Sequence, residues 1–215
     1  MTLISTAALF FYGLYSSLHS YYADSFERVR VWTKPLLMPL LGLFYYLAPG
    51  DSPWIYSALL FAWLGDIALL KHSKVFFMLG LVSFLVGHLC MSTHLVGLLS
   101  TSLTAAAPVA IFIVILSLAL GLFNYLRPHL GSLKLPVLAY CLVLANKGCL
   151  ALILMWQIPN AYTALVAVGA LVFMVSDFTL AINRFVKPIQ KAHLWVMSSY
   201  TLAQAMMVLG LSQSL

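Results

Sequence analysis

Apolar stretches long enough to cross a membrane recur along the whole chain and leave little sequence for anything else. A helix rises 1.5 Å per residue, so roughly 17 to 25 residues cross a hydrocarbon core ~30 Å thick. Breaks at charges, prolines and glycines predict eight spans, near residues 3–22, 35–49, 54–70, 75–97, 105–126, 135–157, 162–182 and 192–212. Because only 7% of the residues are charged and 63% are hydrophobic, a water-soluble domain is excluded. We therefore predict an all-α membrane protein, with residues 1–215 forming one polytopic bundle of about eight transmembrane helices.

The basic residues predict how this bundle is oriented. Ten of the eleven fall in alternate loops, which must share one side of the membrane. They are Arg28, Arg30, Lys34, Lys71, Lys74, Arg127, Lys134, Arg184, Lys187 and Lys191. The positive-inside rule places these loops in the cytoplasm and both termini on the far side, and we expect a bacterial inner membrane. The net charge of +6 then faces anionic lipid head groups, and nucleic acid is not an expected partner.

Two aspartates interrupt the apolar spans of a chain that has only five acidic residues. Asp66 lies in LLFAWLGDIALLK and Asp177 in GALVFMVSDFTLAINRF. A charge at the centre of a membrane helix costs about 2.5 to 3.5 kcal/mol, so each aspartate requires an explanation. One interpretation is structural: each pairs with a cation near the interface, such as Lys71 or Arg184. The other is that the two carboxyl groups share a functional site.

A weak internal similarity makes a shared site geometrically reasonable. Lys34-Pro35 opens the second predicted span and Lys134-Leu135-Pro136 the sixth. Gly-Asp occurs in the third and Ser-Asp in the seventh, each with a leucine three residues after the aspartate. These pairs support the hypothesis of two parallel four-helix repeats related by an axis along the membrane normal. Under this hypothesis Asp66 and Asp177 lie at similar depth near the cytoplasmic ends of their helices.

Other polar residues also lie inside predicted spans. His88, Asn146, Lys147, Tyr200 and Gln204 belong to this group. Taken singly, His88 or Gln204 fits an interhelical hydrogen-bonding contact better than a catalytic role. Lys147 is the one basic residue outside the predicted cytoplasmic loops, and it needs an anion: either one of the aspartates or the phosphate of a ligand.

Five motifs in order resemble those of the YhhN family of membrane lysoplasmalogenases. They are KPLLMPLL at 34–41, GD at 65–66, FLVGH at 84–88, SDFTLA at 176–181 and YTLAQ at 200–204. The resemblance implies an eight-helix enzyme that hydrolyses the vinyl ether bond of lysoplasmalogens to a fatty aldehyde and glycerophosphoethanolamine or glycerophosphocholine. The matched positions are Lys34, Asp66, His88, Ser176, Asp177, Tyr200 and Gln204. It also implies a lysophospholipid substrate within the membrane.

The chemistry of a vinyl ether suits two buried carboxyl groups and requires no cofactor or metal. A carboxylic acid kept neutral by apolar surroundings can protonate the alkene carbon, while an ionised carboxylate stabilises the resulting cation and orients water. We therefore predict Asp66, Asp177 and His88 as the catalytic residues, with the division of labour between the aspartates left open. The predicted substrate-binding residues are Lys34, Asn146, Lys147, Ser176, Arg184, Tyr200 and Gln204. Within this set, Lys147 would hold one carboxylate ionised and Lys34 and Arg184 would bind the lipid phosphate.

Two functions of other classes are the alternatives. A proton-coupled or lipid transporter would use the same aspartates as proton carriers. A metal-dependent membrane hydrolase would use His88, His94 or His193 beside an aspartate, but His88 and His94 are six residues apart and no HExxH motif occurs. A serine nucleophile has no GxSxG motif to support it. The sequence makes no prediction of the oligomeric state.

Overall fold

The computed structural model describes residues 2–48, 50–71, 73–100 and 106–213, and this part of the chain contains eight α-helices and no strand. The helices are α1 (Leu3–Ser25), α2 (Glu27–Leu47), α3 (Pro53–Ala68), α4 (Lys74–Leu98), α5 (Ala106–Leu126), α6 (Lys134–Gln157), α7 (Ala161–Ala181) and α8 (Ala192–Leu211). Two 3₁₀ turns, η1 (Arg127–His129) and η2 (Gly131–Leu133), join α5 to α6, and a π-helical turn, η3 (Ile182–Val186), follows α7. The predicted all-α bundle of eight helices is confirmed.

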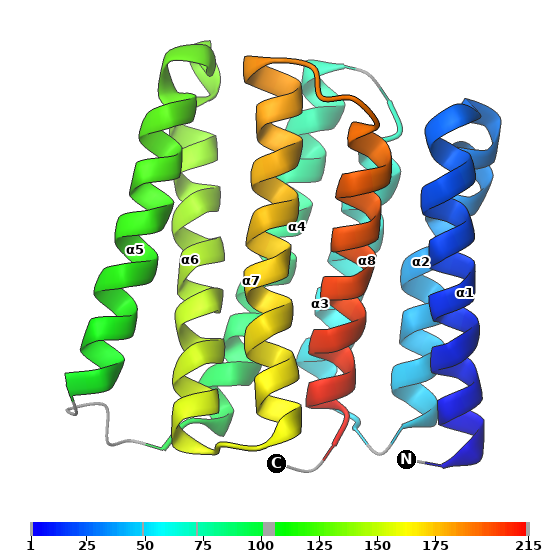
Figure 1. Cartoon of the computed structure of the whole chain (residues 1–215), viewed down its shortest axis with the longest axis vertical. Helices are drawn as coiled ribbons and strands as arrows, with labels where there is room; N and C mark the ends of the chain where they lie inside the picture. The colour runs from blue at the N-terminus through cyan, green and yellow to red at the C-terminus, as the bar shows by residue number, and fades with distance from the viewer. Residues whose placement is uncertain (1, 49, 72, 101–105, 214–215) are drawn as a thin grey trace.

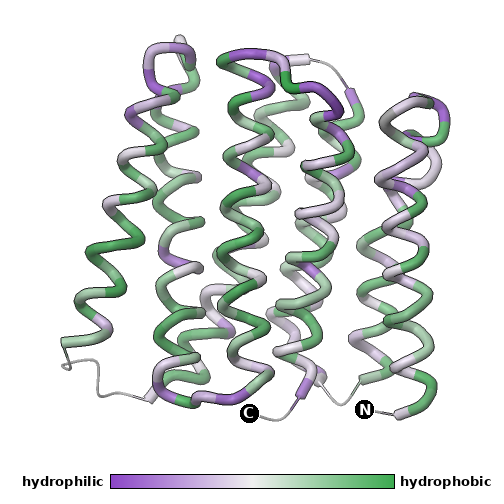
Figure 2. Tube along the Cα trace, in the orientation of Figure 1, coloured by the Kyte–Doolittle hydropathy of each residue, from purple (hydrophilic) through white to green (hydrophobic). Residues whose placement is uncertain are grey.

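The helices stand side by side, with both termini at one end of the bundle (Figure 1). The connections α1–α2, α3–α4, α5–α6 and α7–α8 meet at the opposite end, which we call the basic end because most of the lysines and arginines fall in or beside these turns. Figure 2 shows hydrophobic residues along most of the helix lengths and hydrophilic ones gathered at the connections. Five described helical stretches are long and apolar enough to cross a membrane: Lys74–Leu98, Ala106–His129, Gly131–Gln157, Ala161–Val186 and Ala192–Leu211. The chain is thus a multi-pass membrane protein, and which side the basic end faces stays a prediction.

The second predicted span begins too late. We expected it over 35–49 with Lys34 in a loop, whereas α2 begins at Glu27 and runs through Lys34, Pro35 and Pro39. Because Pro39 has no N–H, the carbonyl of Pro35 lacks its helical donor. The indole Nε1 of Trp63 in α3 donates to this carbonyl at 2.8 Å. A neighbouring helix thus satisfies the backbone group that the proline leaves unpaired, which is how membrane helices tolerate proline.

Helix α8 packs most extensively on α7, and the contact depends on a glycine. A Cβ atom at Gly210 would lie 2.5 Å from both the carbonyl oxygen of Tyr162 and Cγ2 of Val166. Small residues at such points let membrane helices approach closely. Other contacts join α3 to α4 and α2, α1 to α2, α6 to α4, α5 and α7, and α8 to α1 and α2. The packing of α4 on α6 and of α2 on α8 is what a parallel repeat requires, and the repeat itself stays a hypothesis.

Candidate active site

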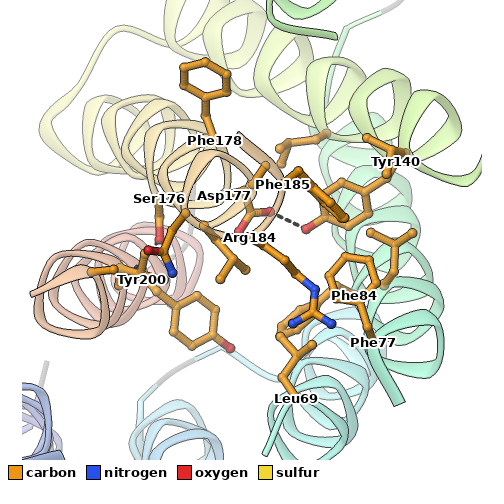
Figure 3. Close-up of a pocket in the computed structure, with 18 of the residues that line it drawn as sticks. Leu69, Phe77, Phe84, Tyr140, Ser176, Asp177, Phe178, Arg184, Phe185 and Tyr200 are labelled. Atoms are coloured by element: carbon orange, nitrogen blue, oxygen red, sulfur yellow. Dashed lines mark hydrogen bonds between the residues drawn. The ribbon is translucent and has the colours of Figure 1, made fainter. Parts of the chain in front are cut away.

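A cavity of about 440 Å³ lies towards the basic end of the bundle, with walls from seven helices. Apolar side chains such as Leu69, Phe77 and Phe84 make up most of its lining (Figure 3). Asp66 from α3 and Asp177 from α7 both lie on its wall, so the two aspartates converge on one cavity as predicted. The volume is within the range of small-molecule sites, which are typically apolar clefts with a few placed polar groups.

Asp66 is held in a buried ion pair. Its side chain is 2% exposed, and Oδ1 lies 3.2 Å from Nζ of Lys34 in α2. The hydroxyl of Tyr200 in α8 donates to Oδ2 at 2.9 Å. The sequence suggested Lys71 as a structural partner, but the ammonium of Lys71 lies over the ring of Phe76, 4.4 Å from its centroid.

The bond between Trp63 and Pro35 explains the position of this ion pair. Trp63 precedes Asp66 by about one helical turn, and Pro35 follows Lys34 directly. Fixing the indole of Trp63 to the carbonyl of Pro35 sets the register of α3 against α2, which brings the carboxyl of Asp66 to the ammonium of Lys34. The KP dipeptide therefore positions a charged residue of the site rather than ending a loop.

Asp177 is part of a second hydrogen-bonded group, and it is less buried than Asp66. The hydroxyl of Tyr140 in α6 donates to its Oδ2 (Figure 3). His88 Nε2 in α4 lies 3.0 Å from the same hydroxyl, and Nζ of Lys147 in α6 lies 3.3 Å from His88 Nδ1. The ammonium of Lys147 also sits 3.9 Å from the ring centroid of Phe173, a cation–π contact.

The observed contacts of Lys147 and Lys34 therefore differ from those expected from the sequence. We expected Lys147 to hold one carboxylate ionised and Lys34 to lie at the cytoplasmic rim. Instead, Lys34 is buried against Asp66, and Lys147 reaches Asp177 only through His88 and Tyr140. His88 also lies behind Tyr140 rather than on the wall of the large cavity.

Tyr140 is the principal residue that the sequence interpretation missed. A signal was present, since Tyr140 precedes Lys147 by seven residues and so lies two turns away on the same face of α6. Arg30 of α2 was noted only as a loop cation and His193 of α8 only as a candidate metal ligand, yet both line the cavity.

Ser176 and Gln204 are buried beside the site. The hydroxyl of Ser176 donates to the carbonyl of Val196 in α8 at 3.0 Å, and Ser176 lines the cavity. Gln204 lies one turn after Tyr200 and lines a second cavity of only about 10 Å³, together with His88 and Lys147.

The remaining two predicted residues lie in very different places. Arg184 is on the π-helical turn η3 after α7, a kind of turn that often marks functional sites. Its guanidinium reaches across the cavity to lie 4.3 Å from the ring centroid of Phe77 (Figure 3). Asn146, by contrast, is exposed on α6 and outside the cavity lining, so the structure does not bring it together with the other predicted substrate-binding residues. Adjacent residues of a helix point about 100° apart, so only Lys147 of this pair faces the core.

The three histidines of the metal-dependent alternative lie in separate environments. His88 bonds to Tyr140, His94 Nδ1 lies 2.9 Å from the hydroxyl of Ser52, and His193 packs edge-on against His19 with ring centroids 5.6 Å apart. In the described ranges, no group of three or more His, Cys, Asp or Glu side chains has the arrangement of a metal site.

The fold and the cavity define a multi-pass membrane protein with a polar site enclosed among its helices. The chain belongs to the YhhN family, whose sequence model matches residues 29–211, and the resemblance seen in the motifs is confirmed. It is similar to a lysoplasmalogenase of Mycobacterium bovis, with 31% identity over 163 residues that cover 74% of this chain and 60% of the relative. It is also similar to lysoplasmalogenase TMEM86B of Sus scrofa (34% over 183 residues, 82% of this chain and 74% of the relative) and to lysoplasmalogenase TMEM86A of Homo sapiens (28% over 216 residues, 98% and 86%).

The chain spans 60% of the length of the mycobacterial relatives it matches. No solved structure matches it.

Proposed function

We propose that this protein hydrolyses the vinyl ether bond of lysoplasmalogens, releasing a fatty aldehyde and glycerophosphoethanolamine or glycerophosphocholine. The relatives named lysoplasmalogenase support the reaction class. The observation that carries the proposal is the pair of carboxyl groups, Asp66 and Asp177, that line one apolar cavity with different partners.

These partners indicate how the two carboxyl groups divide the work. Asp66 forms an ion pair with Lys34 and accepts a hydrogen bond from Tyr200, so it is suited to remain ionised and to stabilise a nearby cation. Asp177 is the less buried carboxyl and accepts its hydrogen bond from a neutral tyrosine, so it is suited to carry and donate a proton. We assign Asp177 as the general acid and Asp66 as the residue that stabilises the cation and orients water.

The reaction then proceeds in three balanced steps. The carboxylic acid of Asp177 donates its proton to the outer alkene carbon, and the π electrons form the new C–H bond, leaving an oxocarbenium ion at the carbon bonded to oxygen. Water attacks that carbon and gives a proton to the carboxylate of Asp177, a reversal of roles as in retaining glycosidases. The hemiacetal then breaks its bond to the glycerol oxygen, which takes the hydroxyl proton, and aldehyde and alcohol separate.

The cations of the cavity suit the phosphate of the head group. Arg30 and Arg184 lie on its wall at the basic end, with His193 and the paired Lys34 nearby. An arginine guanidinium binds a phosphate through two parallel hydrogen bonds. The alkenyl chain would lie along the apolar wall that Leu69, Phe77 and Phe84 contribute.

The decisive experiment compares two lipids with the purified protein. Incubation with a lysoplasmalogen should release free aldehyde, and incubation with an ester lysophospholipid of the same chain and head group should release no fatty acid. Fatty acid from the ester lipid would indicate a lysophospholipase instead. Passage of the lipid across a reconstituted bilayer with no aldehyde formed would indicate a carrier.

Removal of metal tests the metal-dependent alternative. Exhaustive chelation should leave aldehyde release unchanged, because the proposed steps use only carboxyl groups and water. A loss of activity that added zinc restores would contradict the two-carboxyl mechanism.

A further inference from the structure

Three hydrogen bonds join Lys147, His88, Tyr140 and Asp177 in series, and their donors all point towards Asp177. Tyr140 donates its hydroxyl proton to Asp177, so its oxygen is left to accept from His88 Nε2–H. A neutral imidazole protonated at Nε2 has its lone pair at Nδ1, and that atom faces the ammonium of Lys147 at 3.3 Å. From Lys147 to Asp177, each donor therefore faces the next acceptor. This hydrogen-bonded series links residues of α6, α4 and α7.

The Lys147 end of this hydrogen-bonded series is enclosed. Lys147 is 1% exposed and His88 is 5% exposed, and the aromatic ring of Phe173 covers the ammonium. The cavity beside them has about 10 Å³, hardly the space of one water molecule. The near end, Asp177, opens on the substrate cavity. A proton that enters or leaves Lys147 is thus expected to pass through His88 and Tyr140.

We infer that Lys147, His88 and Tyr140 form a reversible proton store that loads Asp177 for catalysis. In the resting state Lys147 is an ammonium and Asp177 a carboxylate. When Tyr140 gives its proton to Asp177, it takes one from His88 Nε2, and His88 takes one from Lys147 at Nδ1. The result is a neutral amine, a neutral imidazole in its other tautomer, an intact phenol and a carboxylic acid, so one proton has moved and none is gained or lost.

Substrate binding is the event that would drive this transfer. A lipid in the cavity replaces the water around Asp177 with hydrocarbon, and charges are far less stable in such surroundings than in water. The transfer neutralises the two separated charges, those of Lys147 and Asp177, and leaves His88 and Tyr140 neutral as before. When water attacks the oxocarbenium ion, the water gives a proton to the carboxylate of Asp177. Once the products leave, a proton passes from Asp177 back to Lys147 through Tyr140 and His88.

This inference rests on the proposed function, because it assigns the source of the proton that the vinyl ether receives. It also changes the role first expected of Lys147. The sequence suggested that Lys147 keeps a carboxylate ionised, whereas as a store it must give up its own proton. An arginine at this position separates the two roles, because a guanidinium keeps the charge and the donors but does not deprotonate in proteins.

Kinetics of four variants provide the first arm of the test. Tyr140→Phe removes the hydroxyl that links the chain, Lys147→Met removes the proton, and Lys147→Arg keeps the charge alone. All three should lower kcat for aldehyde release at least about 100-fold with little change in KM, since general acid catalysis contributes roughly 10² to 10⁴ in rate. Tyr45→Phe is the matched control: Tyr45 is a buried tyrosine outside the cavity, hydrogen-bonded to the backbone N–H of Ser52, and its substitution should leave kcat unchanged. A Lys147→Arg protein with kcat within tenfold of wild type would overturn the inference.

Infrared difference spectroscopy provides a second arm that does not depend on turnover. The ligand is a 1-O-alkyl lysophospholipid, which has no alkene to protonate. Its binding to the wild-type protein should produce the carbonyl band of a protonated carboxyl group, and this band should be absent in Asp177→Asn and in Lys147→Arg. A band that persists in Lys147→Arg, or no band in wild type, would overturn the proton store.

The two arms distinguish the inference from the proposed function. If the wild-type protein releases no aldehyde, the proposed function fails, and the infrared arm still reports whether Asp177 receives a proton from Lys147. If the wild-type protein releases aldehyde and Lys147→Arg does so equally well, the function stands and only the proton store fails. Melting temperatures in detergent identify any variant whose loss of activity reflects misfolding, and the conservative Tyr140→Phe then decides the kinetic arm.

Discussion

Asp66 and Asp177 line the same cavity, but their neighbours differ in charge. Asp66 faces the ammonium of Lys34, whereas Asp177 faces the hydroxyl of Tyr140. Two acids in one apolar site become chemically distinct through such differences in environment.

Substitution of either acid tests its part in the reaction. Asp177→Asn and Asp66→Asn should each lower aldehyde release by at least about 100-fold, because in the proposed mechanism one loses the proton donor and the other loses the charge that stabilises the cation. Initial rates of aldehyde formation by the purified variants are the measurement. Asp51→Asn, at an exposed aspartate in the connection between α2 and α3 and outside the cavity lining, should be fully active. Near-normal turnover by Asp66→Asn or Asp177→Asn would remove that residue from the mechanism.

The ion pair of Lys34 and Asp66 should also be visible in stability. Lys34→Met leaves the carboxylate of Asp66 buried without its partner, a change that typically costs about 3 to 5 kcal/mol. The double variant Lys34→Met with Asp66→Asn removes both charges and should unfold at a higher denaturant concentration than Lys34→Met alone. Lys187→Met, at an exposed lysine, is the control. If the double variant were no more stable than the single one, Asp66 would not carry a charge in the folded protein.

The sequence was sufficient to find both aspartates, because a carboxyl group in an apolar span is expensive enough to be informative. It was not sufficient to identify the side chains that each aspartate contacts. The partners Lys34, Tyr200 and Tyr140 come from three other helices, and their meeting depends on how each helix is rotated about its axis. Asn146 is another residue whose position depends on helix rotation: its neighbour Lys147 faces the core, while Asn146 itself is exposed.

At the scale of the helix, the sequence predicted most spans to within a few residues and failed where a helix depends on its neighbour. The start of α2 was placed too late because proline normally interrupts a helix, whereas the donor that satisfies the Pro35 carbonyl belongs to Trp63 in α3. The end of the seventh span, predicted at residue 182, lies one residue from the observed end of α7, but the turn that follows it was not predicted. After Ala181 the chain continues as the π-helical turn that carries Arg184 to the cavity, and no periodicity in the sequence marks this change.

The contact between α7 and α8 yields a prediction for a single glycine. Gly210→Ala should destabilise the bundle by roughly 1 to 3 kcal/mol, because the added methyl group would overlap backbone atoms of α7 that cannot move aside as a side chain would. Thermal unfolding in detergent is the measurement. Gly121→Ala in α5 is the control, since nothing lies within 4 Å of a Cβ there, and it should be neutral or slightly stabilising. Equal melting temperatures for the two variants would contradict the close approach of α8 to α7.

At the scale of the whole molecule, an even number of helices brings both termini to the end opposite the basic loops (Figure 1). The positive-inside rule then predicts that the termini face away from the cytoplasm. A phosphatase that is active only outside the cytoplasm should be active when fused after residue 213. The same enzyme inserted in the α7–α8 connection should be inactive. The reverse pattern would show that the basic end faces outwards.

The cavity extends from apolar walls deep among the helices to the exposed guanidinium of Arg184 at the basic end. For a reaction that cleaves an amphiphile into an apolar and a polar fragment, this position gives the apolar fragment access to lipid and the polar fragment access to water. A long-chain aldehyde would partition into the surrounding lipid, whereas a glycerophosphodiester would diffuse into the aqueous phase beyond the arginine. Dilution of the two fragments into separate phases would make their recombination rare and would draw the hydrolysis to completion.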